Sequence, residues 1–310
     1  MRILVTGGAG FIGSHICERL VGSDHDVVVL DDLSTGLASN LEHLPVTFIE
    51  GSITTPPAVD QAMEGVDAVA HLAALGSVPR SIDDPATTFQ TNAVGTLHVL
   101  EAARAQGAHV TFASSSSVYG SIPTLPRTED LPTRPISPYG ASKLSAESLV
   151  LAYTSTYNMR NIALRFFNVY GPRQRPDGPY AAVIPRFINA ALTGSPIDIH
   201  GTGEQSRDFT YVTTVARVVE KALTQPDLRP TTPINLAFGT TTTINQIASS
   251  VEEILGIQLE RRHSPNRPAD IAASTNNPAL LHRTFPDVTD VTITAGLTQT
   301  CEWFAAQSRN

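Results

Sequence analysis

The chain has 310 residues, of which 41% are hydrophobic and 16% charged, a composition typical of a globular protein with a substantial core. Its formal net charge of -8 disfavours nucleic acid or an anionic membrane surface as a partner. No apolar run is long enough to cross a bilayer, and no signal peptide is expected because the first strand starts at residue 2, so we expect a cytoplasmic protein. With only Cys17 and Cys301 present, no disulfide is assigned.

The first expected element is a strand at residues 2–6, which breaks at a glycine-rich turn and is followed by a helix. Gly8, Gly10 and Gly13 match the G-x-G-x-x-G pattern of dinucleotide-binding turns. Glycine lets the backbone approach a pyrophosphate, and the helix N-terminus supplies N–H groups and partial positive charge. The residues predicted to contact the cofactor at this turn are Gly7, Gly10, Phe11, Ile12 and Gly13.

A second strand, expected at residues 27–30, ends in Asp31 and Asp32. Asp31 lies 18 residues after Gly13, close to the spacing of about 20 residues expected for the carboxylate that binds the adenosine ribose. A carboxylate at this place repels a 2′-phosphate, and no Arg or Lys follows before residue 80. The sequence therefore favours NAD over NADP as the cofactor.

Further strands are expected at residues 46–50, 68–72 and 110–113, with a long helix at 88–106 between the last two. Alternating strands and helices predict an α/β fold with a doubly wound parallel sheet of the Rossmann type. In such a sheet ligands bind at the carboxyl ends of the strands.

Several of the expected strands end in residues suited to a ligand site. Ala73 and Ala74 follow one strand, and residues 114–117, all serine, follow another. His71 lies within a strand and is interpreted as a packing residue. The histidines and cysteines show no spacing typical of a metal site, so no metal is expected.

Tyr139 and Lys143 lie four residues apart at the start of a helix that is expected to begin after Pro138. This spacing places the phenol and the ammonium on one face, one turn apart. Both the ammonium and the helix N-terminus are expected to lower the pKa of the phenol from its usual value of about 10. The pair therefore predicts a proton carrier, although the same pair on an inert exposed helix is the alternative when it is considered alone.

With four later motifs, at residues 91–96, 165–172, 207–212 and 267–270, the sequence resembles the extended short-chain dehydrogenase/reductase family. This family contains NAD-dependent epimerases, dehydratases and decarboxylases of sugar nucleotides. The resemblance runs over nearly the whole chain. It implies a Rossmann-like NAD-binding domain at residues 1–168 and a smaller α+β substrate-binding region at 169–310, from which segments around 209–240 return to the first domain.

The resemblance also implies roles for individual residues. Tyr139 is implied to carry the proton, Lys143 to hold the nicotinamide ribose, and Ser115 to hydrogen-bond the sugar O4. Ser52 stands where the family usually has an aspartate that meets the adenine amino group. The other residues implied to contact NAD are Asp32, Ile53, Leu72, Ala73, Ala74, Asn92 and Phe166, of which Asn92 is also implied to help hold the active-site helix in place.

The two residues that directly follow Ser115 distinguish the activities within the family. Dehydratases carry Asp-Glu there and UDP-glucuronate decarboxylases carry Glu at the second, whereas this chain has Ser116 and Ser117. Serine does not take up a proton at neutral pH, so the resemblance points to a UDP-sugar 4-epimerase. A UDP-glucuronate 4-epimerase is the alternative, and a dehydratase, a decarboxylase or a non-catalytic NAD-binding protein is less favoured.

The second half of the chain is implied to hold the UDP-sugar. Ser274 lies where the family limits the size of the sugar C2 substituent, and its small side chain favours acceptance of UDP-GlcNAc and UDP-GalNAc beside UDP-glucose and UDP-galactose. Arg80 is suited to pair with a carboxylate at C6 of the sugar, which leaves a uronic-acid epimerase as an alternative. The residues implied to contact substrate are Ser77, Arg80, Ser115, Ser116, Ser117, Asn168, Ala182, Val183, Arg207, Arg267, Asp270 and Ser274.

The resemblance further implies a homodimer. Helices around residues 92–106 and 140–157 would pair with the same helices of a second copy in a four-helix bundle. The residues themselves show only that these helices are amphipathic.

Overall fold

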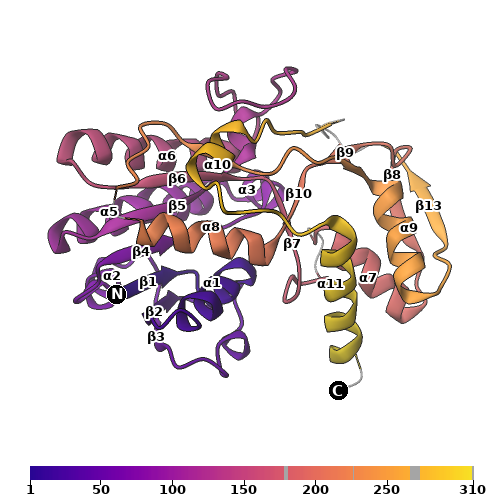
Figure 1. Cartoon of the computed structure of the whole chain (residues 1–310), viewed down its shortest axis with the longest axis horizontal. Coiled ribbons are helices and arrows are strands. Elements are labelled where there is room, and N and C mark those ends of the chain that lie inside the picture. Colours follow the sequence, from indigo (N-terminus) through magenta and orange to yellow (C-terminus); the bar gives the residue numbers. More distant parts are fainter. Residues whose placement is uncertain (178–180, 226, 266–272, 309–310) are drawn as a thin grey trace.

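The computed structural model describes residues 1–177, 181–225, 227–265 and 273–308. Within them, a parallel sheet of seven strands forms the centre of the larger part of the molecule, in the order β11-β6-β5-β4-β1-β2-β3 (Figure 1). The strands are β1 (Arg2–Thr6), β2 (Asp26–Asp31), β3 (Thr47–Glu50), β4 (Ala68–His71), β5 (His109–Ser115), β6 (Ile162–Phe166) and β11 (Ile234–Leu236). The predicted Rossmann-like doubly wound architecture is confirmed.

Both faces of this sheet are buried, which explains the continuous apolar runs of its strands. Ile3 and Val5 of β1 belong to the core on one face, while Leu4 between them belongs to the core on the other. The first face is covered by α1 (Phe11–Val21) and α8 (Val212–Thr224), and the second by α2 (Pro56–Met63), α5 (Gly95–Gln106) and α6 (Pro138–Tyr157).

The long helix expected at residues 88–106 is interrupted by a wider turn. It begins as α4 (Pro85–Phe89), passes through the π-helical turn η2 (Gln90–Val94) and continues as α5. The short helix α3 (Val78–Asp83) precedes it, η1 (Ala38–Asn40) follows β2, and η3 (Ser116–Tyr119) follows β5. The π-helical turn contains Asn92, and such turns are frequently found at functional sites.

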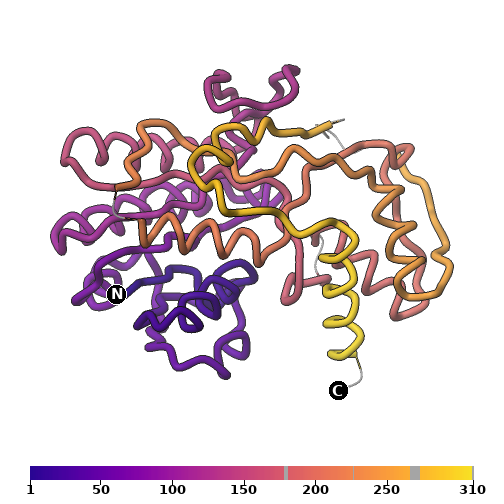
Figure 2. Tube along the Cα trace, in the orientation of Figure 1, coloured from indigo at the N-terminus to yellow at the C-terminus, as the bar shows by residue number. Residues whose placement is uncertain are grey.

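A smaller part of the molecule lies beside the large sheet and has a core of its own. Its main elements are α7 (Val183–Thr193), β8 (Ile197–His200), α9 (Ile244–Leu255), β13 (Arg261–Ser264) and α11 (Ile293–Gln307). Two short two-stranded sheets are also present, β7 (Asn168–Tyr170) with β10 (Phe209–Tyr211) and β9 (Ser206–Arg207) with β12 (Thr242–Thr243). Figure 2 shows that the polypeptide leaves the large sheet after β6, returns to it with α8, β11 and α10 (Ala279–Thr284), and leaves again to form α11.

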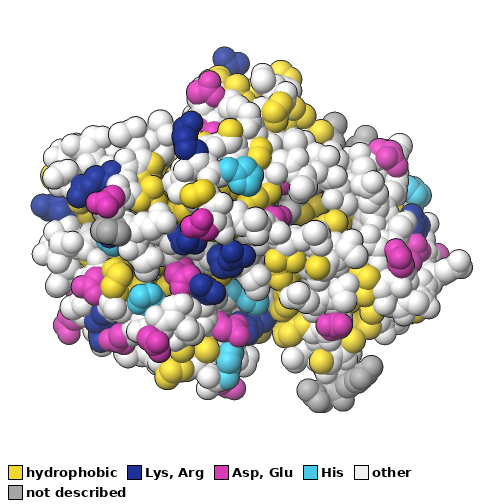
Figure 3. Space-filling view, in the orientation of Figure 1, with side chains coloured by type: hydrophobic (Ala, Val, Ile, Leu, Met, Phe, Trp, Pro, Cys, Tyr) yellow, Lys and Arg dark blue, Asp and Glu magenta, His cyan; other side chains and the backbone are white. Residues whose placement is uncertain are grey.

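The surface is of mixed charge. On the face shown in Figure 3, positive and negative side chains of the described residues are interspersed. Among the described helices, none has both the length and the apolar character that a membrane span requires. Cys17 and Cys301 are buried and carry free thiols.

Candidate active site

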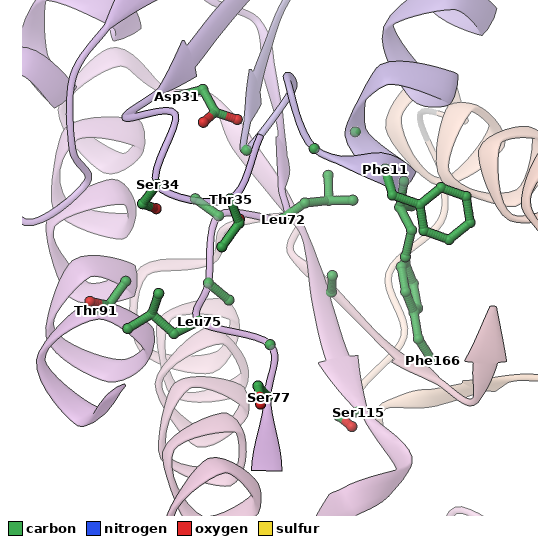
Figure 4. Close-up of a pocket in the computed structure, with 18 of the residues that line it drawn as sticks. Phe11, Asp31, Ser34, Thr35, Leu72, Leu75, Ser77, Thr91, Ser115 and Phe166 are labelled. Carbon is green, nitrogen blue, oxygen red and sulfur yellow. The ribbon is translucent and has the colours of Figure 1, made fainter. Parts of the chain in front are cut away.

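A cavity of about 810 Å³ opens at the carboxyl ends of the central strands. Its walls come from the ends of β1, β2, β4, β5 and β6, from the start of α6 and from the segment that leads into α7. Figure 4 shows Asp31 and Ser34 at one end of it and Ser115 towards the other. The cavity is therefore long enough to bring the predicted dinucleotide turn and the predicted catalytic residues into one site.

The glycine turn between β1 and α1 forms one wall of this cavity. Gly7 has a φ of +73°, a backbone conformation that favours glycine, and its N–H donates to the Leu30 carbonyl at 2.8 Å. A Cβ on Gly13 would collide with the Gly7 carbonyl and with Gly8 Cα. Because α1 starts at Phe11 against this cradle, its N-terminal N–H groups meet the space that a pyrophosphate requires, and the turn fits NAD.

Asp31 is buried at the end of β2, in the cavity wall. Its Oδ2 accepts from the Ala9 N–H at 2.9 Å and its Oδ1 from the Leu33 N–H at 2.9 Å. Burial raises the pKa of this carboxyl, and the two backbone hydrogen bonds oppose the rise. Ser34 and Thr35 lie beside it (Figure 4), and the sequence analysis missed both although only Leu33 separates them from the Asp31-Asp32 pair.

Lys143 lies deep in the wall, one turn into α6. The helix is started by Ser137, whose Oγ accepts from the Gly140 N–H at 3.1 Å. Lys143 Nζ donates to the Ala113 carbonyl at 2.8 Å and lies 4.8 Å from the centre of the Phe112 ring. Burial lowers the pKa of this ammonium to about 7.

Tyr139 meets Ser115 in the cavity wall, so the structure brings two of the predicted catalytic side chains into contact. Burial raises the pKa of the Tyr139 phenol, and the hydrogen bond with the Ser115 side chain opposes this rise. The predicted lowering of the phenol pKa by Lys143 is therefore wrong. Burial is the larger influence on the phenol, and it also lowers the pKa of the Lys143 ammonium.

Asn92 connects the segment after β4 to the first turns of α6. Its Oδ1 accepts from the Leu75 N–H at 2.8 Å, and its Nδ2 donates to Ser142 Oγ at 3.0 Å. The Ser142 hydroxyl in turn donates to the Tyr139 carbonyl at 2.8 Å. Asn92 does not line the cavity, so its contacts with the protein are those of a residue that positions the first turn of α6.

His71 is fully buried and serves as a packing residue, as expected. Its Nδ1 lies 2.7 Å from Thr6 Oγ1 and its Nε2 lies 2.9 Å from Thr96 Oγ1. The Thr96 hydroxyl donates its own proton to the Asn92 carbonyl, so its oxygen accepts from His71. The ring proton of His71 therefore lies on Nε2. Burial and the nearby Lys143 lower the pKa of His71 to about 3, which keeps the ring neutral.

Most of the residues predicted from the sequence lie together in this cavity. Those that line it are Gly7, Gly10, Phe11, Ile12, Gly13, Asp31, Asp32, Ile53, Leu72, Ala73, Ala74, Ser77, Arg80, Ser115, Tyr139, Lys143, Phe166 and Ala182. Those among the described residues that do not line it are Ser52, Asn92, Ser116, Ser117, Asn168, Val183, Arg207 and Ser274. Ser52 Oγ instead lies 3.0 Å from Thr54 Oγ1, and Arg267 and Asp270 lie outside the described residues.

The structure adds lining residues that the sequence analysis did not identify. Gln174, Arg175 and Asp177 line the cavity from the segment after β7, and Arg175 pairs with Asp177 at 2.6 Å. Thr91 lines it from the π-helical turn. The sequence offered one indication of Gln174, Arg175 and Asp177, which is that their segment directly follows the motif at residues 165–172.

The whole chain is similar to known proteins of one family. The family model described as the NAD dependent epimerase/dehydratase family matches residues 3–237. A UDP-glucose 4-epimerase of Mycolicibacterium smegmatis is 34% identical over 317 residues, which cover 100% of both chains. The structure of a UDP-N-acetylglucosamine 4-epimerase from Methanobrevibacter ruminantium, in complex with UDP-N-acetylmuramic acid, matches with a TM-score of 0.94 and 36% identity over 99% of this chain and 98% of that one. A Thermus thermophilus UDP-glucose 4-epimerase in complex with NAD matches with a TM-score of 0.89 and 36% identity over 98% and 99% of the two chains. The chain belongs to the NAD-dependent epimerase/dehydratase family.

Proposed function

We propose that the protein is an NAD-dependent UDP-sugar 4-epimerase that accepts UDP-GlcNAc and UDP-GalNAc as well as UDP-glucose and UDP-galactose. The observation that carries this proposal is the contact between Tyr139 and Ser115 in the cavity that also contains the glycine turn and Asp31. The names of the similar proteins support the same activity, since they include epimerases of both plain and N-acetylated UDP-sugars.

The chemistry that NAD supplies when bound is removal of a hydride from the sugar C4 and its return to the opposite face. Tyr139 takes the proton of the 4-hydroxyl in the first half of the reaction and gives it back in the second, so no net proton is released. Ser115 hydrogen-bonds the same oxygen and holds it within reach of the phenol. Gly7, Gly13 and Asp31 would hold the cofactor, and Lys143 would bind its nicotinamide ribose.

The residues after Ser115 support redox chemistry at a single carbon. Ser116 and Ser117 lie in the short helix η3 and provide no carboxyl group for acid or base work at neighbouring carbons. A second candidate, a UDP-glucuronate 4-epimerase, is favoured by Arg80, whose side chain lines the cavity and can pair with a carboxylate.

The direct test offers the purified protein a panel of UDP-hexoses and resolves the products by NMR, with and without added NAD. The panel contains the glucose, galactose, N-acetylglucosamine, N-acetylgalactosamine and glucuronate forms. Interconversion of 4-epimers with no net NADH supports the proposal. Turnover of the glucuronate form alone would replace it with the second candidate, and loss of water or carbon dioxide from the sugar would overturn both.

A bulky side chain at Ser274 is expected to remove activity on N-acetylated sugars. Ser274 does not line the cavity, so this expectation rests on the family resemblance, in which the side chain at this position limits the sugar C2 substituent. With Ser274→Tyr, kcat/KM for UDP-GlcNAc should fall at least about a hundredfold while that for UDP-glucose changes less than about threefold. Steady-state rates on both sugars test this. The control is Ser274→Ala, which should keep both activities, and equal losses on both sugars with Ser274→Tyr would contradict the assignment.

We also propose that the protein forms a homodimer through α5 and α6, the helices that the family resemblance implies for a four-helix bundle, together with α3 and α4, which pack against α6. Ile82 and Phe89 are exposed there, by 64% and 47%, although large hydrophobic side chains normally lie inside. The double variant Ile82→Asp/Phe89→Asp is expected to sediment as a monomer. Leu125→Asp, an equally apolar exposed residue on the loop before α6, should leave the dimer intact, and a dimer that survives the double variant argues against this interface.

A further inference from the structure

Five buried polar side chains form a continuous hydrogen-bonded series that starts beside the cavity and has no part in the mechanism above. We name this series the Tyr119 network, and its members are Glu147, Arg165, Tyr119, Asn235 and Asn276. They come from α6, β6, η3, β11 and the segment before α10. Buried polar groups of this kind are costly unless each has a partner, so a complete series points to a definite role.

The near end of the network is fixed to the elements that carry the catalytic side chains. Glu147 lies one turn after Lys143 on α6, and the Ser114 hydroxyl, next to Ser115, donates to its Oε2 at 2.6 Å. Arg165 pairs with both carboxylate oxygens of Glu147, Nε at 2.9 Å and Nη2 at 2.7 Å. Such a bidentate pair defines geometry as well as charge.

The middle of the network has one direction of hydrogen bonding. Arg165 Nη1 can only donate, so the Tyr119 oxygen accepts from it at 2.7 Å. The single Tyr119 proton is then directed to Asn235 Oδ1 at 2.7 Å, a shorter contact than the 3.1 Å to the Thr128 carbonyl. Asn235 Nδ2 donates in turn to Asn276 Oδ1 at 2.9 Å. The order of donors and acceptors therefore depends on the Tyr119 hydroxyl.

The far end lies between two residues predicted to meet the sugar nucleotide. The Asn276 N–H donates to Asp208 Oδ2 at 3.1 Å, next to Arg207. Two residues before Asn276, the Ser274 N–H donates to the Ser206 carbonyl at 3.1 Å. A displacement of Asn276 would therefore move both segments.

We propose that Tyr119 is a positioning residue that holds the segment carrying Ser274 in register with the strand carrying Ser115. It acts through Asn235 and Asn276 and touches neither substrate nor cofactor. When its hydroxyl is removed, the bidentate ion pair still fixes the near end, and the Asn276 side chain still donates to the Ala237 carbonyl at 2.8 Å. The change therefore falls on the Asn235 amide and, through it, on the alignment of the far end. The result is weaker binding of the sugar nucleotide with little change in the chemical step; the role rests on the proposed function.

The test is Tyr119→Phe, which keeps the ring but leaves Asn235 Oδ1 without its donor. We expect KM for the UDP-sugar and the dissociation constant of UDP, measured by calorimetry, to rise about tenfold, as loss of one buried hydrogen bond implies. NAD affinity should be unchanged and kcat should stay within about twofold, because uniform binding rather than transition-state stabilisation is lost.

Tyr211→Phe is the matched control. Tyr211 is also buried, its hydroxyl also donates to an amide oxygen, Gln299 Oε1 at 3.0 Å, and it is not part of the network. Equal effects of the two variants on UDP binding, or a fall in kcat with unchanged KM, would overturn the positioning role. If Tyr119→Phe does not fold, Asn276→Ala carries the same expectation. UDP binding is read independently of turnover, so an inactive wild type would refute the epimerase proposal and leave this measurement decisive for the network.

Discussion

Replacement of Tyr139 by phenylalanine is expected to lower kcat for 4-epimerisation about a thousandfold, because the proton of the 4-hydroxyl then has no acceptor. The ring keeps its packing, and the glycine turn and Asp31 are not altered, so NAD affinity should remain close to that of the wild type. Rates by NMR of the UDP-sugar products and NAD affinity by calorimetry provide the two readouts. Together they separate loss of chemistry from loss of the site.

Tyr153→Phe is the control for this substitution. It removes the hydroxyl of another buried tyrosine on α6, one that donates to Glu101 far from the cavity, and it should leave kcat within about twofold. A Tyr139→Phe enzyme that retains more than about a tenth of the wild-type kcat would show that the proton moves by another route.

Glu147→Gln is expected to lower the free energy of unfolding by about 3–5 kcal/mol, the largest effect on stability that we predict. The side chains of Glu147 and Arg165 are only 3% and 5% exposed, so the substitution leaves the guanidinium charge buried without its counter-charge. It also weakens the partner of the Ser114 hydroxyl. Equilibrium unfolding in urea, with NAD absent, measures the difference.

The exposed pair of Arg262 and Glu260 offers a matched control, because its side chains are 60% and 66% exposed. Glu260→Gln removes the same charge from the same kind of pair and should change the free energy of unfolding by less than about 0.5 kcal/mol. Similar losses in the two variants would mean that burial of the Glu147 pair does not determine its contribution.

The part of the site that depends on local pattern was predictable from the sequence. The strand Arg2–Thr6, the glycine turn and the carboxylate of Asp31 follow one another within a single βαβ unit, and the four-residue spacing of Tyr139 and Lys143 requires only a helix. These signals need no knowledge of the rest of the fold. In the structure the predicted cofactor turn and the predicted catalytic pair line one cavity.

Features that depend on depth and on long-range contact were not predictable. Spacing places Lys143 near Tyr139 but does not show that burial dominates both pKa values, which is why the predicted direction for the phenol was wrong. Gln174 lies in a segment without periodicity. The contact between Tyr119 and Asn235 joins residues 116 positions apart, and no local rule connects them.

The repeated passage of the polypeptide between the large sheet and the smaller part limits how the enzyme can admit a bulky ligand. A hinge needs a connection where a few residues absorb the rotation. Here the polypeptide crosses between the two parts several times, and all of these crossing segments would have to bend together. Entry and exit of a sugar nucleotide should therefore proceed by local movement of side chains and short segments at the rim, with the two halves of the molecule remaining at a nearly constant mutual angle throughout turnover.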